Sequence, residues 1–144
     1  MKQKKLLLLP LLFFCGFVYS QINSSLADET GIWILDKTVN KVAFYHKIEM
    51  CNNQKVVFIK LDNRNAYNVD ISWNNSFTIS TQGNSIDGFK SDYKLRIPKG
   101  ESFAKNCNDL KFKDLIINAY DVDPARPVEI QSFNVKNMVI NKAL

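Results

Sequence analysis

The chain has 144 residues, a formal net charge of +5 at pH 7 and a hydrophobic content of 46%. That length suits a single domain, which can bury roughly two-thirds of its unfolded surface. Basic and acidic residues are well interspersed, so they do not form the basic patch on which nucleic-acid binding depends. We therefore expect no nucleic-acid partner.

Residues 1–20 have the features of a cleavable secretion signal. A short basic segment precedes an apolar run over residues 6–18, and Ser20 is a small residue at the expected cleavage site. We predict a cut before Gln21, which leaves residues 21–144 as one exported domain, periplasmic or extracellular. Three lysines leave with the signal, so the net charge of +5 falls to +2.

Two alternatives to simple cleavage follow from the same segment. The apolar run is shorter than the roughly 20 residues that cross a bilayer, so we expect no stable membrane span once the signal is removed. A lipoprotein cut at Cys15 is the other alternative. The residue before such a cysteine has to be small, and Phe14 is not.

Cleavage also decides which cysteines remain. Cys15 would leave with the signal, and Cys51 and Cys107 would be left in an oxidising compartment. We predict a disulfide between them. In the chain-entropy model, closing so long a loop stabilises a domain by about 4 kcal/mol. The alternative is a pair of separately buried thiols.

Alternating polar and apolar residues predict strands through most of the chain. We expect them at residues 32–35, 42–51, 56–61, 67–74, 77–81, 93–97, 111–118 and 128–140, the last in one or two pieces. Polar loops at 82–88 and 98–100 separate some of them. Seven or eight short strands at this spacing predict an all-β, antiparallel β-sandwich, with a small barrel as the alternative.

The first three long runs predict how neighbouring strands connect. One face of the run 42–51 is formed by Val42, Phe44, His46, Ile48 and Met50. The run 56–61 is apolar on both faces, as in a central strand. The Asn52-Asn53-Gln54 break predicts a hairpin between these two runs. The turn Asn63-Arg64-Asn65 would extend that hairpin into a meander with the run 67–74.

Three segments together resemble a known class of fold. They are Val-Val-Phe-Ile-Lys-Leu-Asp-Asn at 56–63, Val-Asp-Ile-Ser-Trp at 69–73 and Leu-Arg-Ile-Pro-Lys-Gly-Glu-Ser at 95–102. In this order they resemble the immunoglobulin-like sandwiches of bacterial exported proteins. The signal followed by Gln21 is similar to that of small exported proteins of the Bacteroidota. The resemblance implies an immunoglobulin-like fold over about residues 42–105, and no functional residue carries over from it.

Residues that could carry catalysis or bind metal are few. His46 is the only histidine, so a small hydrolase would use it as a general base with nearby acids. It shares its face with apolar residues, which favours a core histidine, and we expect no enzyme and no catalytic residue. Asp121 and Asp123 could gather around Ca²⁺, but Pro124 and Ala125 stand where further ligands and a glycine belong. We expect no metal and no cofactor.

Aromatic residues offer the remaining binding hypothesis. Tyr67, Trp73 and Phe77 could form a platform for sugars, while the alternation of their strand with Val69 and Ile71 favours core packing. We expect a non-catalytic binding or structural module of the periplasm or cell surface, with an envelope protein or glycan as partner. An inhibitor or immunity-type protein acting through the loop 82–88 is a further alternative, beside the His46 hydrolase.

The cleavage site gives the first testable prediction. The exported protein should begin at Gln21, because the small-residue rule places the cut after Ser20. Intact mass spectrometry of the exported protein measures this directly. A mass that includes lipid on Cys15, or the uncut signal, would contradict the prediction.

Overall fold

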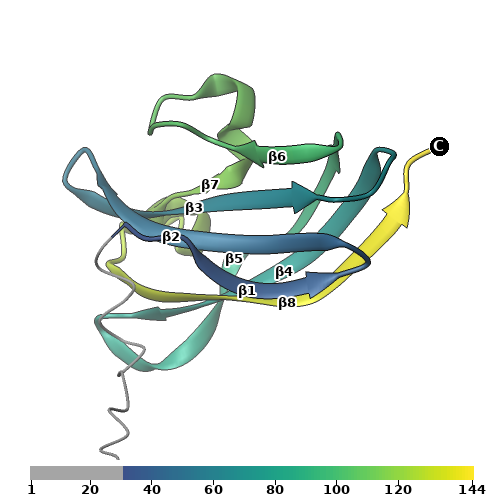
Figure 1. Ribbon diagram of the computed structural model, residues 1–144. Coiled ribbons are helices and arrows are strands. Elements are labelled where there is room, and N and C mark those ends of the chain that lie inside the picture. The colour runs from purple at the N-terminus through teal and green to yellow at the C-terminus, as the bar shows by residue number, and fades with distance from the viewer. Residues whose placement is uncertain (1–30) are drawn as a thin grey trace, which may run out of the picture.

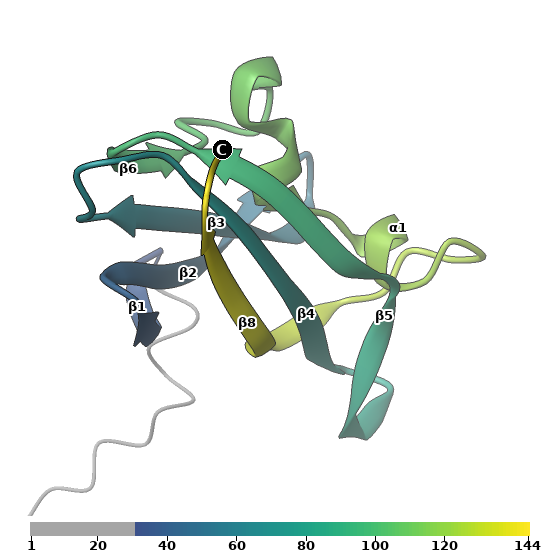
Figure 2. The same cartoon turned by 90° about the vertical axis from the view of Figure 1, so that its right-hand side faces the viewer.

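The computed structural model describes residues 31–144, which form two antiparallel sheets packed face to face (Figures 1 and 2). The predicted signal and its cleavage site lie outside the described residues. Sheet A has the order β1 (Ile34–Val39), β2 (Val42–Cys51), β3 (Gln54–Asn63) and β6 (Gly100–Phe103), with β7 (Ile116–Ile117) also paired to β3. Sheet B has the order β5 (Gln82–Ile97), β4 (Val69–Ile79) and β8 (Ile130–Lys142). The predicted all-β sandwich is confirmed, and neither sheet closes into a barrel.

Two tight hairpins join the first three strands. Asn52 and Asn53 both have positive φ, and Cys51 pairs with Gln54 directly across the turn. Asn40 and its neighbour Lys41 adopt positive φ in the same way between β1 and β2. Two successive residues of positive φ match the twist of antiparallel strands, and asparagine tolerates that conformation well. The predicted hairpin at residues 52–54 is therefore confirmed.

The predicted meander of three strands is wrong, because β3 and β4 belong to different sheets. The buried Asn63 side chain organises the connection between them. Its Nδ2 donates to the carbonyl oxygens of Tyr67 (2.9 Å) and Pro98 (3.1 Å), and its Oδ1 accepts from the Asn65 amide at 3.0 Å. These bonds give hydrogen-bond partners to main-chain carbonyl and amide groups where the chain crosses from one sheet to the other.

Three further segments differ from the sequence prediction. Strand β4 (Val69–Ile79) joins the predicted strands at 67–74 and 77–81 into one, but it begins after Tyr67 and ends before residues 80–81. The predicted loop 82–88 is the first part of β5, where Ile86 pairs with Phe77. Residues 111–118 were expected to form one strand. Instead, a 3₁₀ helix η2 (Leu110–Leu115) precedes the two-residue β7.

The main core lies between the sheets. Its largest fully buried side chains include Phe44, Phe77, Ile59, Leu61, Ile71, Ile97, Leu115, Ile117 and Ile130. Trp73 packs edge-on against Phe44, with ring centroids 5.5 Å apart. The helix α1 (Ala119–Val122) packs on β5 at one open side of the sandwich (Figure 2). Met50 was expected on the inward face but is 61% exposed at the end of β2.

A second apolar cluster lies on the outer face of sheet A. Val56 and Phe58 of β3 point away from the main core and are covered by Ala104, Phe112 and Ile116. We call the segment that carries these three residues the cover. A disulfide between Cys51 and Cys107, with Cα atoms 5.9 Å apart, ties the cover to the end of β2. The predicted disulfide is therefore confirmed. No helix within residues 31–144 is long and apolar enough to span a membrane.

The position of Trp73 yields a stability prediction. Trp73→Ala should lower the free energy of unfolding by about 3–5 kcal/mol, because the ring is 2% exposed and its removal leaves a cavity. Tyr67→Ala should change it by less than about 1 kcal/mol, since that ring is 43% exposed. Urea unfolding of the two variants beside the wild type measures both values. Equal effects of the two substitutions would contradict the assignment of Trp73 to the core.

Candidate functional site

The outer face of sheet B is lined by polar side chains from all three strands. In β4, Val69, Ile71 and Trp73 point inward, so the alternate residues Asp70, Ser72 and Asn74 point outward. The register aligns them in three rows, which are Asn141-Asp70-Arg96, Val139-Ser72-Lys94 and Lys136-Asn74-Asp92. Neighbouring strands are about 4.8 Å apart, and the rows follow one another at about 7 Å.

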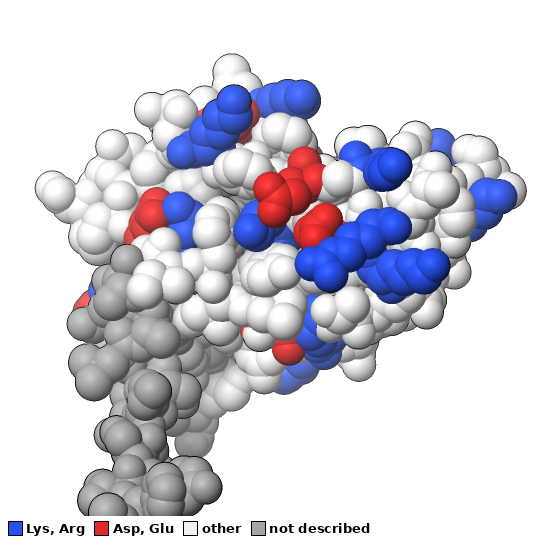
Figure 3. Space-filling model, in the orientation of Figure 1, with Lys and Arg blue, Asp and Glu red and all other residues white. Residues whose placement is uncertain are grey.

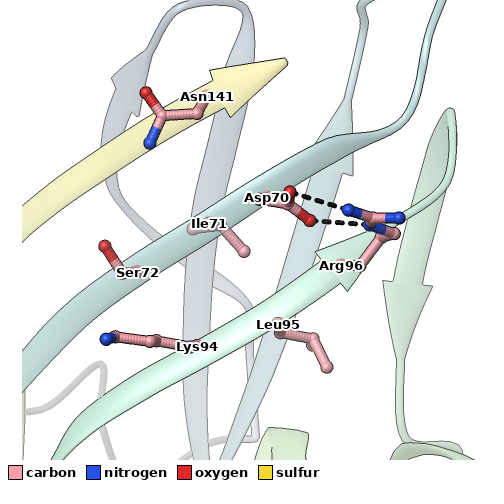
Figure 4. Close-up of a pocket in the computed structure, with 7 residues that line it drawn as sticks. All are labelled: Asp70, Ile71, Ser72, Lys94, Leu95, Arg96 and Asn141. Atoms are coloured by element: carbon pink, nitrogen blue, oxygen red, sulfur yellow. Dashed lines mark hydrogen bonds and ion pairs between the residues drawn. The ribbon is translucent and has the colours of Figure 1, made fainter. Parts of the chain in front are cut away.

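An open hollow of about 490 Å³ lies over the first two rows (Figure 4). At one end, the Arg96 guanidinium donates two hydrogen bonds to the Asp70 carboxylate, at 2.8 and 3.0 Å. This hydrogen-bonded pairing lowers the pKa of Asp70 and raises that of Arg96. Both groups therefore stay charged, in a fixed orientation, over the physiological pH range.

The third row is also held by side-chain contacts. The Asn74 amide donates to Asp92 and its oxygen accepts from Asn137 at 3.1 Å. In the middle row, by contrast, Ser72 Oγ and Lys94 Nζ have no side-chain partner among residues 31–144. Figure 4 shows both pointing to the same side of the sheet. The face thus offers a free hydroxyl and a free ammonium between two fixed polar rows.

Sequence reasoning did not single out this face as a site. Its signal was present in the polar residues that alternate with the core positions of the run 67–74. The matching alternation in residues 92–96 and 137–141 becomes meaningful only when the strand order places those runs on either side of β4.

His46, the candidate general base, lies inside the sandwich and is 3% exposed. Its Nδ1 is 2.7 Å from Oδ2 of Asp36, and its ring packs against Phe133 with centroids 5.0 Å apart. The carboxylate reaches it because β1 has a bulge between Leu35 and Lys37, which turns Asp36 inward. A buried polar pair of this kind satisfies hydrogen bonds at the edge of the core.

The three aromatic candidates for sugar binding do not form one surface. Trp73 and Phe77 are buried in the core, and Trp73 stacks on Tyr93 with centroids 5.1 Å apart. Tyr67 is the exposed member, and Lys142 Nζ lies 5.2 Å from its ring centroid. A planar platform built from all three residues is therefore not present.

The outer face of sheet A carries a different aromatic group. Lys60 Nζ lies 4.5 Å from the ring centroid of Tyr45 and 3.3 Å from Glu101. Lys47 Nζ lies 4.9 Å from the centroid of the half-buried Trp33. Charges of both signs are visible on this face in Figure 3. These lysines pair within the protein, by cation–π and ionic contacts.

The acids considered for Ca²⁺ serve local structure instead. Asp121 caps the main chain at the start of α1, where its carboxylate accepts from the Asn118 amide at 2.9 Å. Asp123 accepts from the Ala125 amide at 3.0 Å and pairs with Arg126. Within residues 31–144, no group of three or more acidic, histidine or cysteine residues is arranged to hold a metal ion.

The Asp70–Arg96 pair gives a prediction about charge. Arg96→Gln should raise the pKa of Asp70 toward the ordinary carboxyl value of about 3.9, because the hydrogen bonds that stabilise the carboxylate are lost. An NMR pH titration of the Asp70 carboxyl carbon measures the shift. Arg64→Gln removes the similar contact to Asp62 and should leave the pKa of Asp70 unchanged. An unaltered value in Arg96→Gln would contradict the assigned cause.

Comparisons with known proteins found no match for this chain. No family model matches it. Searches of the curated proteins and of the solved structures likewise gave no match. What the domain does is therefore inferred from the chemistry of its own residues, and the outer face of sheet B offers an open hollow lined by polar side chains.

Proposed function

We propose that this protein is an exported, non-catalytic binding module of the periplasm or cell surface, and that the outer face of sheet B binds an envelope glycan. The observation that carries the proposal is the middle row, where Ser72 and Lys94 are free between fixed polar rows. The Cys51–Cys107 disulfide supports an oxidising compartment.

The chemistry of the face suits hydroxyl groups. Lysine and arginine only donate hydrogen bonds, carboxylates only accept them, and the serine hydroxyl and asparagine amides do both. A sugar hydroxyl both donates and accepts, so it can pair with any of these groups. Because Asp70 and Arg96 are already oriented by each other, less side-chain entropy is lost when a ligand binds. The open shape of the hollow fits a chain lying across the strands.

The architecture agrees with a binding role. The sandwich has the two-layer arrangement that immunoglobulin-like domains share, although here β1, β2 and β3 lie side by side in one sheet. Domains of this architecture serve many functions, so the site rather than the fold carries the proposal.

One observation favours the alternative of a small hydrolase. The Asp36 carboxylate lies within hydrogen-bond distance of His46, as an acid that orients a catalytic base would. A substrate would have to reach an imidazole that is buried in the sandwich, whereas the face of sheet B is open. The inhibitor alternative loses its proposed loop, because residues 82–88 belong to β5.

The glycan proposal is tested by blocking the middle row. Ser72→Arg should weaken binding to envelope polysaccharides about tenfold or more, because the larger side chain fills the hollow between the fixed rows. Binding is measured on an array of purified bacterial polysaccharides. Thr38→Arg places the same side chain at an exposed position of β1 in the other sheet, and should bind like the wild type.

Two results would overturn the proposal. One is a wild-type protein that is retained by none of the polysaccharides. The other is a cross-linked envelope protein whose capture is lost in Ser72→Arg and kept in Thr38→Arg, since that protein would be the partner of this face. Melting temperatures of both variants control for loss of fold.

A further inference from the structure

A second, smaller cavity lies at the open side of the sandwich, between β5 and η2. It has a volume of about 150 Å³, and its lining residues are Lys90, Asp92, Tyr93, Lys94 and Leu95 of β5, Trp73 of β4 and Asp114 of η2. The hollow on the outer face of sheet B is separate, although Lys94 and Leu95 contribute to both. The cavity has room for a molecule of a few heavy atoms.

The inner wall is aromatic. Trp73 and Tyr93 stack with an interplanar angle of 14°, and both are almost fully buried. An aromatic face attracts a cation that lies over it.

The outer wall carries charges of both signs. Asp92 and Asp114 contribute carboxylates, and Lys90 and Lys94 contribute ammonium groups. Lys90 Nζ lies 4.7 Å from the Tyr93 ring centroid and 3.9 Å from Asp114 Oδ1. This ion pair is long and its two side chains are about half exposed, so opening it costs little.

The backbone leaves Lys90 outside the regular ladder. Asn74 pairs with Asp92 and Ser76 with Asp87, so residues 88–91 bulge out opposite a single residue of β4. A bulge re-aims side chains, and here it places Lys90 above the Tyr93 ring. Gly88 anchors the bulge, because a Cβ at this position would lie 2.8 Å from Cε2 of Phe77.

From this combination of groups, we propose that the cavity binds a small zwitterion, namely a free α-amino acid with an apolar side chain. Its ammonium group takes the place of Lys90 between the Tyr93 ring and Asp114. Its carboxylate pairs with the displaced Lys90, and its side chain lies against Leu95 and the aromatic wall. Burial, together with the charges of Asp121 and Asp114, raises the pKa of Tyr93, so its ring stays uncharged beside the ammonium group. This site goes beyond the proposed glycan-binding function.

The probe is L-valine, which fits the cavity volume, and the signal is the indole N–H resonance of Trp73 in a ¹⁵N-correlation spectrum. The chain has two tryptophans, and Trp33→Phe assigns the two signals. Millimolar L-valine should shift the Trp73 signal and leave the Trp33 signal in place. Isobutylamine lacks the carboxylate and isovalerate lacks the ammonium, so each should bind about tenfold more weakly than valine.

A matched pair of variants tests the role of Asp114. Asp114→Asn should weaken valine binding about tenfold and leave isovalerate binding unchanged. Asp87→Asn removes another exposed carboxylate that pairs with a lysine, Lys136. This control should have no effect on valine binding. The proposal is overturned if valine shifts neither indole signal, or if isobutylamine binds as tightly as valine. It is also overturned if Asp114→Asn and Asp87→Asn weaken valine binding equally. Because this site and the polysaccharide face are probed by different ligands, either can fail alone.

Discussion

Strand β3 has to be buried on both faces, and much of the architecture follows from that requirement. Its inward side chains Val57, Ile59 and Leu61 enter the main core, while Val56 and Phe58 point outward. At about 25 cal/mol per Å² of buried apolar surface, leaving two such side chains in water would cost several kcal/mol. The segment that follows β6 therefore forms a partial third layer over sheet A, which the disulfide holds in place.

The same segment then shapes the other side of the molecule. The chain covers β3 through η2 and β7 and then continues into α1, which packs on β5 beside Gly88. Asp114 and Asp121 thereby come close to Tyr93. Sheet B keeps its outer face uncovered, and its outward residues are mostly polar, with Val139 as an exposed apolar member. The outer face of sheet A is therefore partly used for packing, whereas the outer face of sheet B is the candidate binding surface.

Much of the fold could be predicted from local patterns. The two-sided apolar run at 56–61 identified the central strand, and the Asn52-Asn53 turn identified its hairpin, because both signals depend on neighbouring residues alone. The turn at Asn63 could not be interpreted in this way. It contains the same residue types as a hairpin turn. However, the buried Asn63 side chain donates to the carbonyl oxygen of Pro98, 35 residues further along the chain. This contact holds the chain where it crosses between the sheets.

The candidate sites were harder to predict, for a related reason. The polar rows of sheet B require three strands whose order the sequence does not state, and the cavity beside Tyr93 requires a 3₁₀ turn where alternation predicted a strand. Residues 110–115 alternate well enough, yet Asp109 caps the turn by accepting from the Lys111 amide. The burial of His46 and Trp73 was easier to predict, because each lies on the apolar face of an alternating run.

The attachment of the cover has a consequence for the newly made chain. Until the bond between Cys51 and Cys107 forms, the cover is held to β3 by the four pairs of β6, the two pairs of β7 and its apolar contacts with Val56 and Phe58. A chain in that state exposes Val56 and Phe58 on a strand surface whenever the cover detaches, and such surface favours self-association. Oxidation therefore keeps Val56 and Phe58 covered, because it ties the cover to the end of β2.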